Sequence, residues 1–311
     1  MCPAMVDDMV YKGDVPWHGI GTPILPGTSA QEALIMCGMD WRVDKVDMFT
    51  SSPSTGMTTV PGFVALRRSD SEGILGVTTD RYVPLQNTDL ANVVQGFLDA
   101  GAEIESAGSL KGGKIVWYLL DLHATGDVAS DGIKLYGVLS NGHDGKRAVR
   151  VGYTPIRIVC SNTLAMSESN GLTRTIRVTH RGDVVGGVQA IADSMDLATQ
   201  TFKATVEQYR KLAAISINQN DVKKYVEKVL GLDSEKSTRA KNIVSLVEYK
   251  ALNGIGNERF AGTAWAAYNA ITEYLSHDAG RKIDSRYFNL WFGTAANTNS
   301  RALSMALEMV A

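Results

Sequence analysis

The chain has 311 residues, of which 44% are hydrophobic and 21% are charged, and its formal net charge is −2. This length and hydrophobic content are sufficient for a packed core and exclude a disordered chain. The nearly neutral charge excludes a protein that is basic throughout, although an average can conceal one strongly charged region. The longest apolar stretches, such as residues 115–120, are far shorter than the roughly 20 residues that cross a bilayer as a helix.

The first residues and the cysteines both favour a cytoplasmic protein. Residues 1–8 are acidic, whereas a secretory signal begins with a basic segment followed by an apolar one. Cys2, Cys37 and Cys160 are scattered without CxxC spacing, so they predict neither a disulfide framework nor a zinc site. We therefore expect a protein of the reducing cytoplasm without a membrane segment.

The first 53 residues show weak periodicity and predict an arm that wraps around the body of the protein. Within the arm, Ser29 and Glu32 have the spacing of a capping box, which predicts a helix over residues 29–37. Trp17 and His18, followed closely by two glycines, form an aromatic pair beside an accessible backbone. The favoured interpretation is a packing turn, and the functional alternative is a contact with a ligand or partner.

Residues 63–67 and 74–78 predict a hairpin, and residues 88–100 predict a helix. Further strands are predicted at residues 102–106, 114–122, 133–140, 147–160 and 172–179. Their short spacing favours antiparallel pairing, because a parallel crossover needs a dozen or more residues. After Gly186 the periodicity becomes helical, with helices predicted over residues 186–212, 221–230, 235–252, 263–277 and 300–309.

This order of elements predicts an α+β fold with an antiparallel β-sheet core and packed helices. The predicted division places the sheet-containing core and the N-terminal arm in residues 1–183. A helical part, packed on that core, is predicted for residues 184–311.

Motifs for common catalytic and cofactor sites are absent from the sequence. No Gly-rich loop ends in Gly-Lys-Ser/Thr, and the Gly-x-Gly pairs at residues 19–21 and 254–256 lack the third glycine of a dinucleotide fingerprint. The five histidines lack the i, i+4 spacing of a helical metal site, and no Gly-x-Ser-x-Gly elbow occurs. We therefore nominate no catalytic residue, metal or cofactor, and favour a protein that is not an enzyme.

The most informative segment is basic. Residues 146–181 contain seven lysines and arginines but one acidic residue, Glu168. Guanidinium groups beside an aromatic ring are typical of grooves for single-stranded nucleic acid, where cations meet phosphates and rings stack on bases. The candidate contacts are Lys146, Arg147, Arg150, Tyr153, Arg157, Arg174 and Arg177. The alternative is a solvated sheet face paired with acidic residues of the same chain or of a neighbouring subunit.

Four separated segments carry a resemblance to a known family: residues 16–22, 157–164, 262–270 and 289–293. Together they resemble the phage/plasmid-like protein family, also catalogued as the domain of unknown function DUF932. The resemblance implies a bacterial cytoplasm and a task in the DNA metabolism of mobile elements or in conflict with the host. The order of elements is also similar to that of single-strand annealing proteins of the RecT and Erf kind, which is an analogy of fold.

The favoured hypothesis is ATP-independent binding of single-stranded DNA, with strand annealing, by a homo-oligomer that aligns the basic strands of several subunits. The long helix over residues 186–212 and the apolar stretches around Trp265 and Trp291 motivate the oligomer. One alternative is a phage protein that binds a host protein or a small signalling molecule. Another is an enzyme of unrecognised type, whose site would gather His18, Tyr153, Arg157 and Asn162.

Overall fold

The computed structural model describes residues 6–13, 21–158, 175–186, 195–279, 289–290 and 293–309. The chain divides into two compact units. Unit 1 lies within Met1–Leu122, Gly137–Gly152 and Thr175–Met195, and unit 2 within His123–Tyr136, Tyr153–Arg174 and Asp196–Ala311. The predicted single division near residue 183 therefore differs from the structure, in which the two units interleave along the chain. They interleave because three long strands, β7 (Ile115–Val128), β8 (Asp131–Gly142) and β9 (Val149–Arg157), contribute residues to both units.

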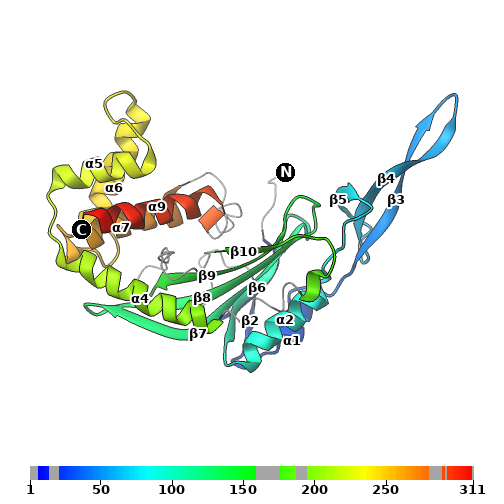
Figure 1. Cartoon of the computed structure of the whole chain (residues 1–311), viewed down its shortest axis with the longest axis horizontal. Helices are drawn as coiled ribbons and strands as arrows, with labels where there is room; N and C mark the ends of the chain where they lie inside the picture. Colours follow the sequence, from blue (N-terminus) through cyan, green and yellow to red (C-terminus); the bar gives the residue numbers. More distant parts are fainter. Residues whose placement is uncertain are drawn as a thin grey trace. The chain divides into compact units, whose positions relative to one another are not determined.

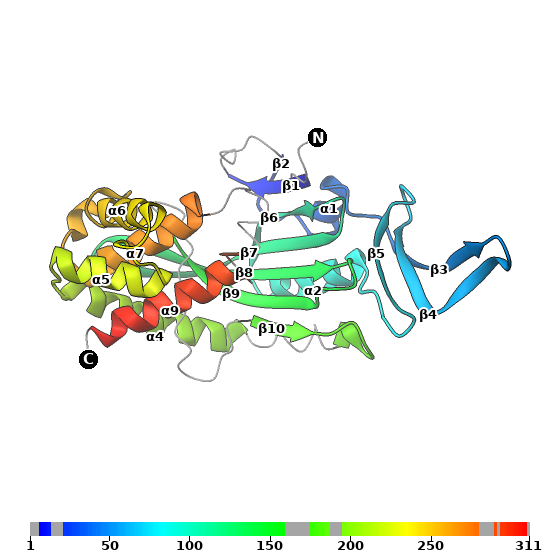
Figure 2. The ribbon, with the colours of Figure 1, turned by 90° about the horizontal axis from the view of Figure 1, so that it is seen from above.

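The main sheet has the strand order β10-β9-β8-β7-β6-β1-β2, which can be followed in Figure 2. Its other strands are β1 (Val6–Lys12), β2 (Thr22–Ile24), β6 (Glu103–Leu110) and β10 (Thr175–Val178). The pairs β10/β9 and β6/β7 are antiparallel, as predicted; β1 also pairs antiparallel with β6, whereas β1 and β2 pair in parallel. Strands β1 and β2 were not predicted, because they lie in the weakly periodic arm.

Two helices of unit 1, α1 (Ala30–Met36) and α2 (Asn87–Asp99), lie side by side against the main sheet (Figure 1). The predicted capping box of α1 is confirmed, because the backbone N–H of Glu32 donates to Ser29 Oγ and the backbone N–H of Ser29 donates to Glu32 Oε2. The inward face of α2 buries Leu90, Val94 and Phe97. These residues follow the apolar stripe that the sequence predicts.

A second sheet in unit 1 consists of β3 (Val43–Ser52), β4 (Gly56–Arg68) and β5 (Ile74–Thr79), paired in that order and antiparallel. The predicted β4–β5 hairpin is confirmed, whereas β3 was not predicted. The β3–β4 ribbon extends beyond β5 in Figure 1, and it leaves Phe49 and Met57 exposed. The half-buried face of β3 includes Asp44 and its exposed face includes Phe49, so the sequence lacks the apolar–polar alternation by which a half-buried strand is recognised.

Unit 2 contains the helices predicted after residue 186, with shifted ends. They are α4 (Met195–Ala214), α5 (Gln219–Leu230), α6 (Thr238–Asn253), α7 (Ala264–Glu273) and α9 (Thr294–Glu308). A short 3₁₀ helix, η1 (Glu258–Phe260), precedes α7, and a π-helical turn, η2 (Tyr274–Asp278), continues it. The rings of Tyr209, Trp265 and Tyr268 pack together in the core, with centroids 5.0–6.1 Å apart.

Pro155 would be expected to interrupt the predicted strand, because proline lacks a backbone N–H, but β9 runs through it to Arg157. Within the described residues, its register with β10 covers Val149 to Gly152.

Candidate nucleic-acid interface

The end of the main sheet in unit 1 brings two predicted basic residues together. In the antiparallel β9–β10 pair, Arg150 lies directly opposite Arg177, and Val149 lies opposite Val178. Directly opposed residues project from the same face of a sheet, and successive residues project from opposite faces. Val149 is fully buried, whereas Arg150 is half-buried and Arg177 is exposed. The two arginines therefore share the face opposite to that of Val149.

A turn ordered by Asp144 supplies two more basic residues. One carboxylate oxygen, Oδ1, accepts the backbone N–H groups of Lys146 at 2.9 Å and Arg147 at 3.1 Å. The other, Oδ2, pairs with the guanidinium of Arg147. Gly145 completes the turn with a φ of 71°, a left-handed conformation that favours glycine. Lys146 is exposed at this turn, and Arg147 is half-buried.

Gly142, at the end of β8, is required to be glycine because Arg147 packs closely against it. A Cβ at Gly142 would lie 2.4 Å from the Cβ of Arg147, which is closer than two carbon atoms can approach. Only glycine therefore allows the chain after the turn to come back against the end of β8 in this way.

The positive charges of Arg147 and Arg177 act electrostatically on Arg150. Burial, followed by the neighbouring charges of Arg177 and Arg147, lowers the pKa of Arg150 from its usual value. Like charges directly opposite each other in a sheet are destabilising, and concentrated positive charge creates an attractive potential for anions. Lys146, Arg147, Arg150 and Arg177 are hereafter called the basic cluster.

His180, which follows β10, has a structural role. Its ring stacks on Tyr82 with centroids 4.5 Å apart, and its Nδ1 lies 3.1 Å from the carbonyl oxygen of Val83. The hydroxyl of Tyr82 donates to the carbonyl of Gly142 at 3.0 Å. Burial lowers the pKa of His180, which favours the neutral form of the ring. These contacts connect the end of β10 to the loop before α2 and to the end of β8.

Arg157 belongs to the interior of unit 2 and not to the basic cluster. It has no exposed surface, and its Nε donates to Asp131 Oδ2 at 2.5 Å. Its terminal nitrogens donate to the carbonyls of Ile255 at 3.1 Å and Gly256 at 2.7 Å. Such a side chain cannot reach a phosphate, so we remove Arg157 from the candidate contacts.

Trp265 shares the carboxylate that binds Arg157, donating from Nε1 to Asp131 Oδ2 at 3.2 Å. Tyr153 is likewise buried, with 5% of its surface exposed, so its ring has no free face on which a base could stack. It is also removed from the candidate contacts. The remaining candidates, Trp17, His18, Asn162 and Arg174, lie outside the described residues.

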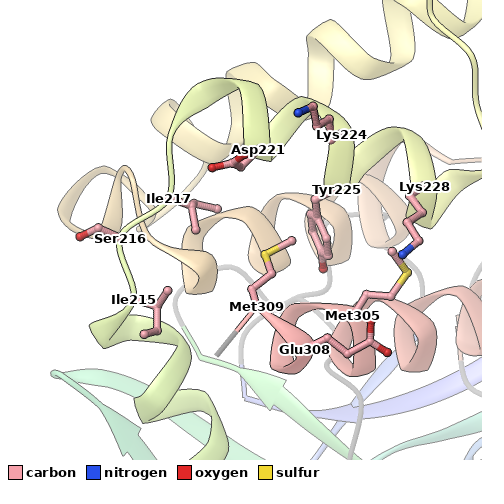
Figure 3. Close-up of a pocket in the computed structure, with 10 residues that line it drawn as sticks. All are labelled: Ile215, Ser216, Ile217, Asp221, Lys224, Tyr225, Lys228, Met305, Glu308 and Met309. Atoms are coloured by element: carbon pink, nitrogen blue, oxygen red, sulfur yellow. The ribbon is translucent and has the colours of Figure 1, made fainter. Parts of the chain in front are cut away.

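A pocket of about 460 Å³ in unit 2 was not predicted from the sequence. Figure 3 shows it between α5, α9 and the segment after α4. Apolar side chains and two residues of each charge sign line it: Ile215, Ile217, Asp221, Lys224, Tyr225, Lys228, Met305, Glu308 and Met309. The hydroxyl of Tyr225 already donates to the carbonyl of Ala302 at 2.9 Å. Because the positive and negative side chains balance and the Tyr225 hydroxyl is already hydrogen-bonded, the pocket favours no particular class of ligand.

Comparison with known proteins identifies the family. A family model described as "Domain of unknown function (DUF932)" matches residues 74–302. The chain belongs to this family. No curated protein and no solved structure matches it. The matched span of this DUF932 chain includes the basic cluster, the Arg157–Asp131 pair and most of α9.

Within the described residues of the DUF932 chain, no helix combines the length and apolar character needed to cross a membrane. Also within them, no group of three or more histidine, cysteine, aspartate or glutamate side chains is arranged to hold a metal ion.

Proposed function

We propose that the protein binds single-stranded DNA without ATP, and that the basic cluster of unit 1 contacts the phosphates. The observation that carries this proposal is the placement of Arg150 directly opposite Arg177, with Arg147 close enough to affect the same pKa. Like charges directly opposite each other destabilise a sheet, and the phosphates of a bound polyanion would add counter-charge to this face. Lys146 at the adjacent turn extends the positive region.

The proposed binding depends little on base sequence. The cluster consists of cationic side chains on strands and a turn, without a helix that could read a groove. Cations that contact phosphates fix the position of the strand without reading bases. Strand annealing by several subunits, in the bacterial cytoplasm and in the DNA metabolism of phages or plasmids, is the biological setting of the proposal.

The test compares DNA binding by variants of matched charge. Fluorescence anisotropy with a labelled single-stranded oligonucleotide at low salt should show binding by the parent protein. Arg177→Gln should weaken this binding about equally for oligonucleotides of different sequence, because a phosphate contact is lost. Arg239→Gln removes an exposed arginine of α6 and should leave the affinity unchanged. Equal effects of the two substitutions would show that only the net charge matters and would refute the assigned site.

A further inference from the structure

Helix α6 has apolar residues on two opposite faces. The inward face buries Ala240, Val244, Val247 and Ala251. On the opposite face Leu246 is 37% exposed, Tyr249 62% and Leu252 47%, and Ile255, just after the helix, is 55% exposed. A helix at the surface of a soluble protein normally presents polar residues to water on its outer face. The outer face of α6 departs from that pattern.

From residue 242 onward, after the exposed Arg239 and Lys241 of the first turn, the same face also lacks charge. Every exposed residue from 242 to 255 is uncharged: Asn242, Ser245, Leu246, Tyr249, Leu252, Asn253 and Ile255. These residues are hereafter called the α6 patch. Lys250 is half-buried and pairs with Glu273 at 2.6 Å. Depletion of charge and exposure of tyrosine and aliphatic side chains are the compositional signature of the core of a protein interface.

Two of the features that first suggested an oligomer are already buried within unit 2, and the third, Trp291, lies outside the described residues. The apolar stripe of α4 is buried, with Phe202 and Tyr209 at most 1% exposed, and Trp265 has no exposed surface. These side chains form the core of the unit and cannot form an interface between copies. The α6 patch is a different surface with the composition that an interface requires.

We propose that the α6 patch is a contact between two copies of this chain related by a two-fold axis. Charge decides between possible occupants. An acidic or basic partner, nucleic acid included, would leave its charges unpaired against this uncharged face, and burying unpaired charge is costly. A second copy brings the same uncharged face, so no like charges meet across the axis. Asn242, Ser245 and Asn253 supply polar groups that can hydrogen-bond across such a contact.

This proposal does not depend on DNA binding, and the solution mass tests it. Light scattering of the full chain at tens of micromolar should give twice the chain mass. Tyr249→Glu places two carboxylates against each other and should weaken association more than about a hundredfold, because like charges across an interface cost several kcal/mol and each 1.4 kcal/mol is tenfold. The control Lys241→Glu makes a larger change of charge at an exposed residue of the same helix outside the patch and should leave the dimer intact.

A mixing experiment distinguishes a two-fold contact from any other. Tyr249→Glu and Tyr249→Lys should each be monomeric, and their equimolar mixture should recover the dimer mass because opposite charges then meet. Circular dichroism and a thermal transition equal to those of Lys241→Glu would show that both variants are folded. A monomeric parent, a Tyr249→Glu variant that stays dimeric, or a mixture that stays monomeric would each overturn the proposal.

Discussion

His143 should make the protein sensitive to mild acid. Its ring has no exposed surface, and Nε2 lies 2.8 Å from Asn87 Oδ1. The amide nitrogen of Asn87 donates to the carbonyl of Met39 at 2.8 Å, so the Asn87 oxygen faces the ring and His143 donates from Nε2. The other ring nitrogen, Nδ1, has no hydrogen-bond partner among the described residues. Burial, with a smaller contribution from His180, lowers the pKa of His143 to about 3.

The direction and size of the effect follow from linkage. The unfolded chain takes up a proton near pH 6.5, whereas the folded protein does so only near pH 3. Between these values the unfolded state binds one more proton, so the free energy of unfolding falls by about 1.4 kcal/mol for each unit of decreasing pH. The contribution of His143 is therefore fully present above pH 6.5. About 2 kcal/mol of it should be lost between pH 7 and pH 5.

The assay is urea unfolding at pH 7 and pH 5, followed by circular dichroism, for the parent and for His143→Gln. Glutamine cannot titrate, and its amide nitrogen can still donate toward Asn87. All other ionisable groups are common to both proteins, so the difference between their acid losses isolates His143. Between pH 7 and pH 5, the free energy of unfolding of the variant should fall by about 2 kcal/mol less than that of the parent. Equal losses would refute the reasoning, because they would mean that His143 is protonated equally in the folded and unfolded states.

Three further substitutions test other parts of the account by urea unfolding. Arg177→Ala should stabilise the DNA-free protein by about 0.2–1 kcal/mol at low salt by relieving Arg150 of a like charge, and a loss of stability would show that Arg177 is paired instead. Asp131→Asn should destabilise unit 2 by about 3–5 kcal/mol, because the buried Arg157 loses its counter-charge; a loss below about 1 kcal/mol would contradict the buried pair. Ser29→Ala should cost about 1 kcal/mol by removing the cap of α1, and an unchanged midpoint would argue against the capping box.

Local signals explain which parts of the fold could be predicted. The capping box of α1 depends on residues three positions apart, and the stripe of α2 repeats every three to four residues, so both are visible in the sequence. Strand β3 was missed because its half-buried face includes Asp44 and its exposed face includes Phe49, so apolar and polar residues do not alternate clearly along it. The interleaved units were missed because β7, β8 and β9 are long enough to contribute residues to both units. The composition of the sequence does not show where one unit ends within a strand.

The candidate site was only partly predictable, because the alternation of side chains along a strand shows which residues share a face but not which of them are buried. The alternation of side chains along a strand predicts Arg150 on the face opposite to Val149 and Val151, and the structure has it there. It could not show that Arg157, six residues after Val151, would meet a carboxylate from β8 and carbonyls from the segment after α6. Those partners are 26 and 98 residues away in the sequence, and only the tertiary fold brings them to the guanidinium.

The salt dependence of single-stranded DNA binding tests the central claim most directly. The slope of the logarithm of the binding constant against the logarithm of salt concentration reports the number of neutralised phosphates, at about 0.7 for each contact with a single strand. Arg150→Gln combined with Arg177→Gln should reduce the magnitude of that slope by about 1.4, and Arg239→Gln should leave it unchanged. An unchanged slope in the double variant, or a folded parent protein that binds no single-stranded DNA at low salt, would contradict the account.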